Sequence, residues 1–221
     1  MTTTTSSKKK KKKGSTPRWL AIPAPKPQLS EAEVNAKYPR MRLQVFMGIF
    51  IGYATFYLIR NNVPLVTPIL TKELGFSNAA IGALSTALLL AYGFSKFFTA
   101  MISDRSNARL FLPIGLVLSG VANILLAMTG YMGEGAGAAG YGAAIASIMA
   151  TIMVFNGIFQ GMGWPPSGRV LVNWFSTSER GTKVSWWNTA HNVGGALSGL
   201  LVAWGFSMFG KTWEVAFWFP A

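Results

Sequence analysis

The sequence lacks cysteine and is poor in charged residues. Asp, Glu, Lys and Arg make up 12% of the 221 residues, about half of the usual share of roughly 25% in soluble domains. With no Cys, disulfides, thiolate metal ligands and cysteine nucleophiles are excluded. Hydrophobic residues account for 51% of the chain. This composition predicts a membrane protein.

Long apolar segments recur along the chain, separated by short polar joints. A helix needs about 20 residues to cross the hydrocarbon of a bilayer. The segments of this length are residues 43–66, 78–102, 110–130, 140–163 and 184–209, and a sixth begins at 213 and is cut off at 221. Because backbone groups in lipid must bond internally, and barrel-like alternation is missing, these spans are expected to be helices. The predicted fold class is an all-α membrane protein.

The first 42 residues are polar and basic. Residues 1–42 hold eleven of the 20 Lys and Arg residues but two of the seven acidic ones, and positions 8–13 are consecutive lysines. Since this segment lacks the apolar core and cleavage site of a secretory signal, we interpret it as a disordered cytoplasmic tail that attracts anionic membrane lipid. Without interleaved aromatic residues or a fold to present the lysines, nucleic acid is not expected as a partner.

The basic residues of the later joints predict the orientation of the chain. The joints at 103–109 and 169–183 carry two and three Lys or Arg residues, whereas those at 71–77 and 210–212 carry one each and 131–139 carries none. Cytoplasmic loops are the ones enriched in Lys and Arg. The pattern predicts a multi-pass protein of the cell (inner or plasma) membrane with a cytoplasmic N-terminus.

Three side chains that can carry positive charge interrupt the apolar spans. Arg60, Lys96 and His191 each lie in such a segment, and the five complete spans contain no Asp or Glu. A charge at membrane depth costs roughly 2.5–3.5 kcal/mol on insertion scales. We therefore expect a polar cavity that receives an anion. Without a carboxylate in any span or a cluster of metal ligands, we expect neither an enzyme, nor a metal site, nor a cofactor.

Helical spacing groups Arg60 with two tyrosines. Tyr53, Tyr57 and Arg60 are spaced i, i+4, i+7, which places them on one face of a helix. An arginine can bind a phosphoryl group through two parallel hydrogen bonds, and phenol groups can donate to its remaining oxygens. The alternative is that Arg60 extends to an outer membrane interface and binds nothing.

Two further groups have the same kind of spacing. Tyr92 and Lys96 form an i, i+4 pair, and Trp187, Asn188 and His191 lie within one helical turn. An imidazole that titrates near neutrality can match its charge to that of a phosphate. Lys96 can instead extend to the cytoplasmic interface, and a single histidine can be a packing residue, so both alternatives stay open.

Several of these segments resemble a known family in both residues and order. Residues 52–60, 91–97, 103–107, 159–166 and 187–195 strongly resemble the organophosphate:phosphate antiporters of the major facilitator superfamily, and most of all the glycerol-3-phosphate transporter branch. The resemblance covers roughly residues 40–221. It implies a twelve-helix transporter of two six-helix halves, of which this chain is the N-terminal half, truncated within helix 6. The missing C-terminal half of the same protein is then a partner.

The resemblance also implies roles for individual residues. Arg60 matches one of a pair of arginines that clamp the phosphate. The positions that match the lining of the same cavity are Tyr53, Tyr57, Lys96, Trp187, Asn188 and His191. Asp104 and Arg105 match a cytoplasmic loop between helices 2 and 3 that takes part in conformational change.

The function implied by the resemblance is exchange of small phosphate anions. Glycerol-3-phosphate is imported while inorganic phosphate leaves, by alternating access around a fixed site. One alternative is a membrane sensor that binds extracellular sugar phosphate without transport. Another is a transporter of a different organophosphate, such as hexose phosphate.

Overall fold

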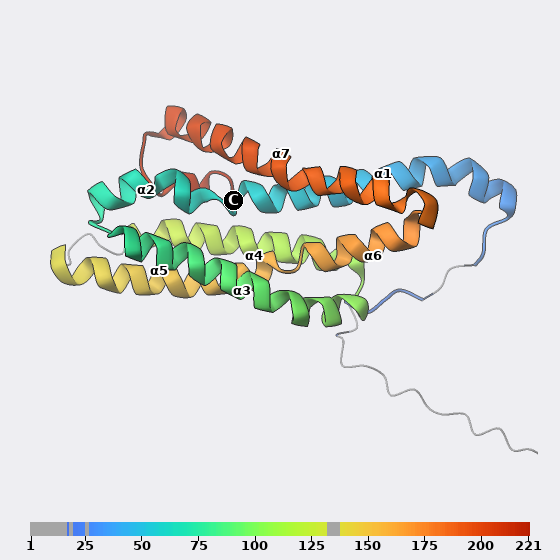
Figure 1. Ribbon diagram of the computed structural model, residues 1–221, viewed down its shortest axis with the longest axis horizontal. Coiled ribbons are helices and arrows are strands. Elements are labelled where there is room, and N and C mark those ends of the chain that lie inside the picture. The colour runs from blue at the N-terminus through green and yellow to red at the C-terminus, as the bar shows by residue number, and fades with distance from the viewer. Residues whose placement is uncertain (1–16, 18–19, 25–26, 132–137) are drawn as a thin grey trace, which may run out of the picture.

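The protein is a bundle of helices that run roughly side by side (Figure 1). The computed structural model describes residues 17, 20–24, 27–131 and 138–221. Its helices are α1 (Glu31–Leu58), α2 (Asn62–Glu73), α3 (Asn78–Asp104), α4 (Ala108–Met128), α5 (Ala138–Gln160), α6 (Trp164–Trp174), α7 (Thr177–Phe209) and α8 (Val215–Trp218). Within these residues the only β-type pairing is an isolated antiparallel bridge between Ala21 and Ser106.

Five helical segments of the described chain are long and apolar enough to cross a membrane. They cover Glu31–Glu73, Asn78–Asp104, Ala108–Tyr131, Ala143–Trp174 and Thr177–Phe209. Their outer faces carry large exposed apolar side chains, such as Phe94, Phe97 and Leu200. An exposed apolar surface of this kind suits lipid. The predicted all-α membrane fold is confirmed.

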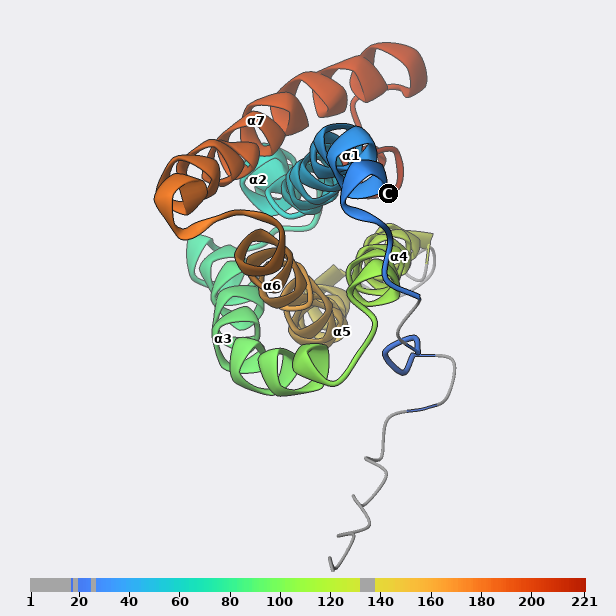
Figure 2. The same ribbon diagram turned by 90° about the vertical axis from the view of Figure 1, so that its right-hand side faces the viewer.

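The helices form two groups in space. Viewed along the bundle, α1, α2 and α7 lie together, opposite α3, α4, α5 and α6 (Figure 2). The most extensive helix packing is between α3 and α5, followed by α1 with α7. Glycines allow both helix pairs to pack closely. A Cβ at Gly157 of α5 would overlap the Leu88 carbonyl oxygen of α3, and a Cβ at Gly194 of α7 would overlap the Ala54 carbonyl oxygen of α1. Gly194 therefore allows α7 to approach the backbone of α1 closely.

The first helix begins earlier than predicted. We placed its start at 43, within a disordered tail of 1–42, but α1 begins at Glu31. Ser30 and Glu33 form a capping box that satisfies amides at this end, and Lys37 pairs with Glu33 at 3.7 Å. Polar turns that extend a helix beyond the hydrocarbon leave no hydropathy signal. Much of the remaining predicted tail, including the lysine run, lies outside the described residues.

Two of the predicted spans are each made of two helices. The span predicted at 43–66 breaks between α1 and α2, just before Pro64, and then continues to Glu73. A proline ring clashes with the carbonyl four residues earlier, so the first turn of a new helix, which has no such carbonyl, suits it best. The span predicted at 140–163 likewise breaks after Gln160, and α6 begins with Pro165 and Pro166 in its first turn. These two prolines therefore lie at the start of a helix.

Because of this second break, the joint predicted at 169–183 is shorter in the structure. Arg169 lies inside α6, and α7 begins at Thr177, not at 184. Ser176 and Glu179 form a capping box at the start of α7, in which the Ser176 amide donates to Glu179 Oε1 at 3.3 Å. Glu179 also forms an ion pair with Arg42 of α1. Part of the glycine-rich joint predicted at 131–139 lies outside the described residues, and the predicted sixth helix is represented by α8.

Candidate functional site

Arg60 lies in the break between α1 and α2, and its side chain is held inside the bundle. Its Nε donates to Gln160 Oε1 of α5 at 3.0 Å. The guanidinium carbon lies 4.2 Å from the ring centroid of Tyr57 and 4.1 Å from that of Tyr92. Cations are attracted to the faces of aromatic rings at such distances. The side chain therefore spans from α1 to α3 and α5 and does not extend to an interface.

One end of the same guanidinium has no partner. Arg60 Nη2 is buried and makes no hydrogen bond to any residue that the structure describes. Guanidinium groups are donors only, and a buried donor without an acceptor is costly, typically by about 1–3 kcal/mol. This end of Arg60 is suited to an acceptor that comes from outside the described chain.

Lys96 of α3 adds a second positive charge. Its Nζ lies 3.9 Å from the Tyr92 centroid, the ring that Arg60 also contacts. Because the Arg60 carbon is 4.1 Å from that centroid, the two charges are no further than about 8 Å apart. At an effective dielectric constant of about 20, such a pair repels by about 2 kcal/mol. An anion near both groups would offset this repulsion.

Aromatic contacts join α7 to this region. The Tyr53 ring lies 5.5 Å from Tyr57 and 4.5 Å from Trp187, and the Tyr57 ring lies 5.5 Å from His191. Trp187 is buried and its Nε1 donates to the Ile49 carbonyl at 3.2 Å. It therefore supports the Tyr53 ring and has no free donor. The imidazole of His191 therefore lies near the same Tyr57 ring that Arg60 contacts.

Three predicted residues are exposed in the described structure. Asn188 of α7 is exposed, unlike the buried Trp187 beside it, and it lies one turn before His191 on the same side of the helix. Asp104 ends α3 and Arg105 follows it as the cap residue, and both are exposed. Since Lys96 precedes Asp104 by two helical turns on α3, the loop residues lie beyond the cation cluster along the bundle.

A buried polar network was missed by the sequence analysis. The Gln160 amide nitrogen donates to the Phe56 carbonyl at 3.3 Å and to Ser119 Oγ at 2.7 Å. Ser119 donates to Asn156 Oδ1 at 2.5 Å, and Asn123 Nδ2 donates to the Ser119 carbonyl at 2.9 Å. The signal was available: positions 119 and 123, and positions 156 and 160, are polar i, i+4 pairs in apolar spans. Buried amides of this kind join helices within a membrane.

Arg169 was also missed as a structural residue, because it was placed in a joint. From α6 it donates to the carbonyl of Ser103 and, at 2.6 Å, to that of Ser106. Carbonyls at the end of a helix have no partner within the helix, and an arginine there is favourable. Arg169 therefore fixes the loop that contains Asp104 and Arg105 against α6.

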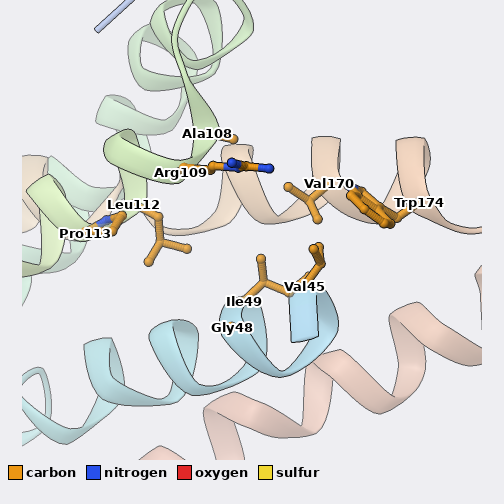
Figure 3. Close-up of a pocket in the computed structure, with 9 residues that line it drawn as sticks. All are labelled: Val45, Gly48, Ile49, Ala108, Arg109, Leu112, Pro113, Val170 and Trp174. Carbon is orange, nitrogen blue, oxygen red and sulfur yellow. The ribbon is translucent and has the colours of Figure 1, made fainter. Parts of the chain in front are cut away.

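A separate cavity of about 300 Å³ lies between α1, α4 and α6. Its walls are largely apolar, with the Arg109 and Trp174 side chains at its edge (Figure 3). None of the predicted site residues lines it. Among the described residues, there is also no group of three or more metal-ligating side chains.

Comparison with known proteins identifies the family. The model of the Major Facilitator Superfamily matches residues 49–221. The chain belongs to this superfamily, and its similarity to curated glycerol-3-phosphate and hexose phosphate transport proteins supports the organophosphate:phosphate antiporter family within it. The resemblance seen in the sequence is confirmed, and the chain is part of a multi-pass membrane protein.

Three curated relatives illustrate the range of the family. The chain is 48% identical over 200 residues to the glycerol-3-phosphate transporter of Bacillus subtilis, covering 90% of the chain and 42% of the relative. It is 36% identical over 206 residues to a probable hexose phosphate transport protein of Chlamydia pneumoniae (91% and 42%). It is 37% identical over 186 residues to the membrane sensor protein UhpC of Escherichia coli (84% and 39%). The chain thus spans about two fifths of the length of these relatives.

Proposed function

We propose that the complete protein is a secondary transporter that imports glycerol-3-phosphate in exchange for inorganic phosphate. The observation that carries this proposal is the Arg60 guanidinium, which is held by Gln160 and two tyrosine rings while its buried Nη2 has no partner. Phosphate oxygens are acceptors, and arginine binds them in parallel pairs. Lys96 supplies a second charge beside the same ring.

Electrostatics gives a reason for exchange. In the empty site the positive charges of Arg60 and Lys96 repel each other, and burial from water strengthens that repulsion. A bound phosphate or organophosphate offsets the repulsion, so the loaded site closes at lower cost than the empty one. The two halves of the protein then move against each other, in alternating access, only while an anion is bound in the site. We assign the other half of the site to the part of the protein that this chain does not contain.

The proposed orientation places the N-terminus in the cytoplasm. The start of α1, the end of α3 and the junction of α6 with α7 lie at the same end of the bundle (Figure 1). This end carries Arg42, Arg105, Arg109, Arg180 and Lys183. Basic residues flank spans on the cytoplasmic side, where anionic lipid is a further partner. We therefore propose a non-enzymatic transport protein of the cell membrane with this orientation.

Exchange in vesicles tests the assignment. The complete protein is reconstituted in phosphate-loaded vesicles, and uptake of labelled glycerol-3-phosphate is followed for wild type, Arg60→Ala and Arg109→Ala. Arg109 is a matched control because it is exposed and lies at the start of α4, away from the cluster. We expect Arg60→Ala to lose exchange and Arg109→Ala to retain it. Equal exchange by Arg60→Ala and wild type would refute the role of this arginine.

A sensor is the second candidate, favoured by the 37% identity to a membrane sensor protein. A sensor needs the same anion site but not the exchange step. The two functions separate in one preparation: saturable binding of glycerol-3-phosphate with no uptake into phosphate-loaded vesicles indicates a sensor. Unlabelled hexose phosphate as a competitor tests the alternative substrate, since preferential displacement by hexose phosphate would replace glycerol-3-phosphate in the proposal.

A further inference from the structure

The amide of Gln160 has a fixed orientation. Gln160 is fully buried. Its nitrogen faces the Phe56 carbonyl, which can only accept, and its oxygen faces Arg60 Nε, which can only donate. The partners on both sides thus dictate which end of the amide points to Arg60. A glutamine in this place presents a neutral oxygen to the guanidinium.

We infer that Gln160 is a positioning residue that aims Arg60 at the anion without neutralising it, an inference that rests on the proposed function. A guanidinium can bind an oxyanion sideways, through Nε and one Nη, or end-on, through both terminal nitrogens. Because Gln160 occupies Nε at 3.0 Å, the sideways mode is blocked. The Tyr57 and Tyr92 rings, at 4.2 and 4.1 Å, restrict rotation of the guanidinium plane. The end-on mode remains, at the end that includes the unpartnered Nη2.

The neutrality of the Gln160 oxygen is part of its role. A carboxylate could hold Arg60 Nε in the same place, because glutamate has the same length and an acceptor at the same position. It would also pair with the guanidinium and compete with the phosphate for its charge. The surrounding network is made of hydroxyl and amide groups: Gln160 donates to Ser119, and Ser119 donates to Asn156. Among the described residues, Arg60 has no acidic partner.

Two substitutions separate charge from geometry. Gln160→Glu and Gln160→Met both remove the donors to Phe56 and Ser119 and so share that structural cost. The first keeps an acceptor for Arg60 and adds a negative charge, whereas the second removes the acceptor and adds no charge. If neutrality matters, Gln160→Glu is the worse of the two although it is closer in shape to the native residue.

The measurement is phosphate exchange by the complete protein in vesicles, with half-saturation and maximal rate determined separately, beside thermal unfolding of each purified variant. We expect Gln160→Glu to raise the half-saturation concentration for inorganic phosphate by about tenfold or more, the size by which a neighbouring charge commonly shifts an ionic equilibrium. Gln160→Met is expected to raise it less. If Gln160→Glu does not fold, Gln160→Met alone decides. A raised half-saturation concentration with an unchanged maximal rate supports positioning, and an unchanged half-saturation concentration overturns it.

The outcomes also separate this inference from the proposed function. If Arg60→Ala abolishes exchange but Gln160→Glu binds phosphate as well as wild type, or better than Gln160→Met, the requirement for a neutral partner of Arg60 is wrong and the transporter assignment stands. If Arg60→Ala exchanges normally, the proposed function itself fails. If the two Gln160 variants lose stability and maximal rate equally with no change in half-saturation, Gln160 has a structural role only, which overturns the inference.

Discussion

Removal of the Tyr92 ring tests whether the two cations are organised in advance of binding. Arg60 comes from the break between α1 and α2 and Lys96 from α3, and both contact this ring, at 4.1 and 3.9 Å. Tyr92→Leu keeps an apolar side chain on α3 but removes the aromatic face. Lys96 then loses its ring contact, and Arg60 keeps Gln160 and Tyr57 but loses one of the groups that restrict it. The two cations can therefore move further apart, which their mutual repulsion favours. Binding of an anion must gather them again.

The expected size follows from the cost of ordering two long side chains. Immobilising such a side chain costs about 0.5–1.5 kcal/mol, so two of them cost about 1–3 kcal/mol. This corresponds to a loss of affinity between about fivefold and about 150-fold. Tyr92→Phe retains the ring face, and its affinity is expected to stay within about twofold of wild type.

The assay is equilibrium binding of labelled phosphate to the purified complete protein, with Tyr131→Leu as the control. Tyr131 is exposed and lies just beyond the end of α4. The reasoning requires a clear difference between Tyr92→Leu and Tyr92→Phe at similar melting temperatures. Equal affinities in these two variants would show that the ring does not organise the cations.

Three further predictions concern packing and the loop. Gly194→Leu should abolish folding because its side chain would overlap a backbone oxygen of α1, whereas Gly199→Leu, with nothing within 4 Å of its Cβ position, should give folded protein by size-exclusion chromatography. Arg169→Ala should speed hydrogen exchange of residues 103–107, because it removes two donors to their carbonyls; unchanged exchange there would count against this anchoring. Glu179→Gln should leave the midpoint of a denaturant titration nearly unchanged, since its ion pair with Arg42 is partly exposed, and a large fall of that midpoint would contradict this.

Spacing along the sequence predicted the helices and part of the cluster for clear physical reasons. Tyr53 and Tyr57 are one turn apart, and their rings do lie together at 5.5 Å. The pairing of Tyr92 with Lys96 also follows from one turn of helix. Local periodicity fixes such neighbours because it needs no knowledge of how helices pack.

Contacts between helices were beyond this reasoning. Trp187 and Asn188 are adjacent in sequence but lie on different faces of α7, and only the packing of α7 on α1 decides which is buried. Gln160 lies 100 residues from Arg60 along the chain. Its i, i+4 spacing with Asn156 marks a polar pair in an apolar span, but spacing along one helix does not show that its hydrogen-bond partner is Arg60.

Equilibrium binding of inorganic phosphate to the complete protein tests the central claim most directly, because transport and sensing both require the site. Labelled phosphate is titrated against wild type, Arg60→Ala and the control Arg109→Ala. The account predicts saturable binding by wild type and Arg109→Ala, displaced by glycerol-3-phosphate, and none by Arg60→Ala. Binding of undiminished affinity to Arg60→Ala would contradict it.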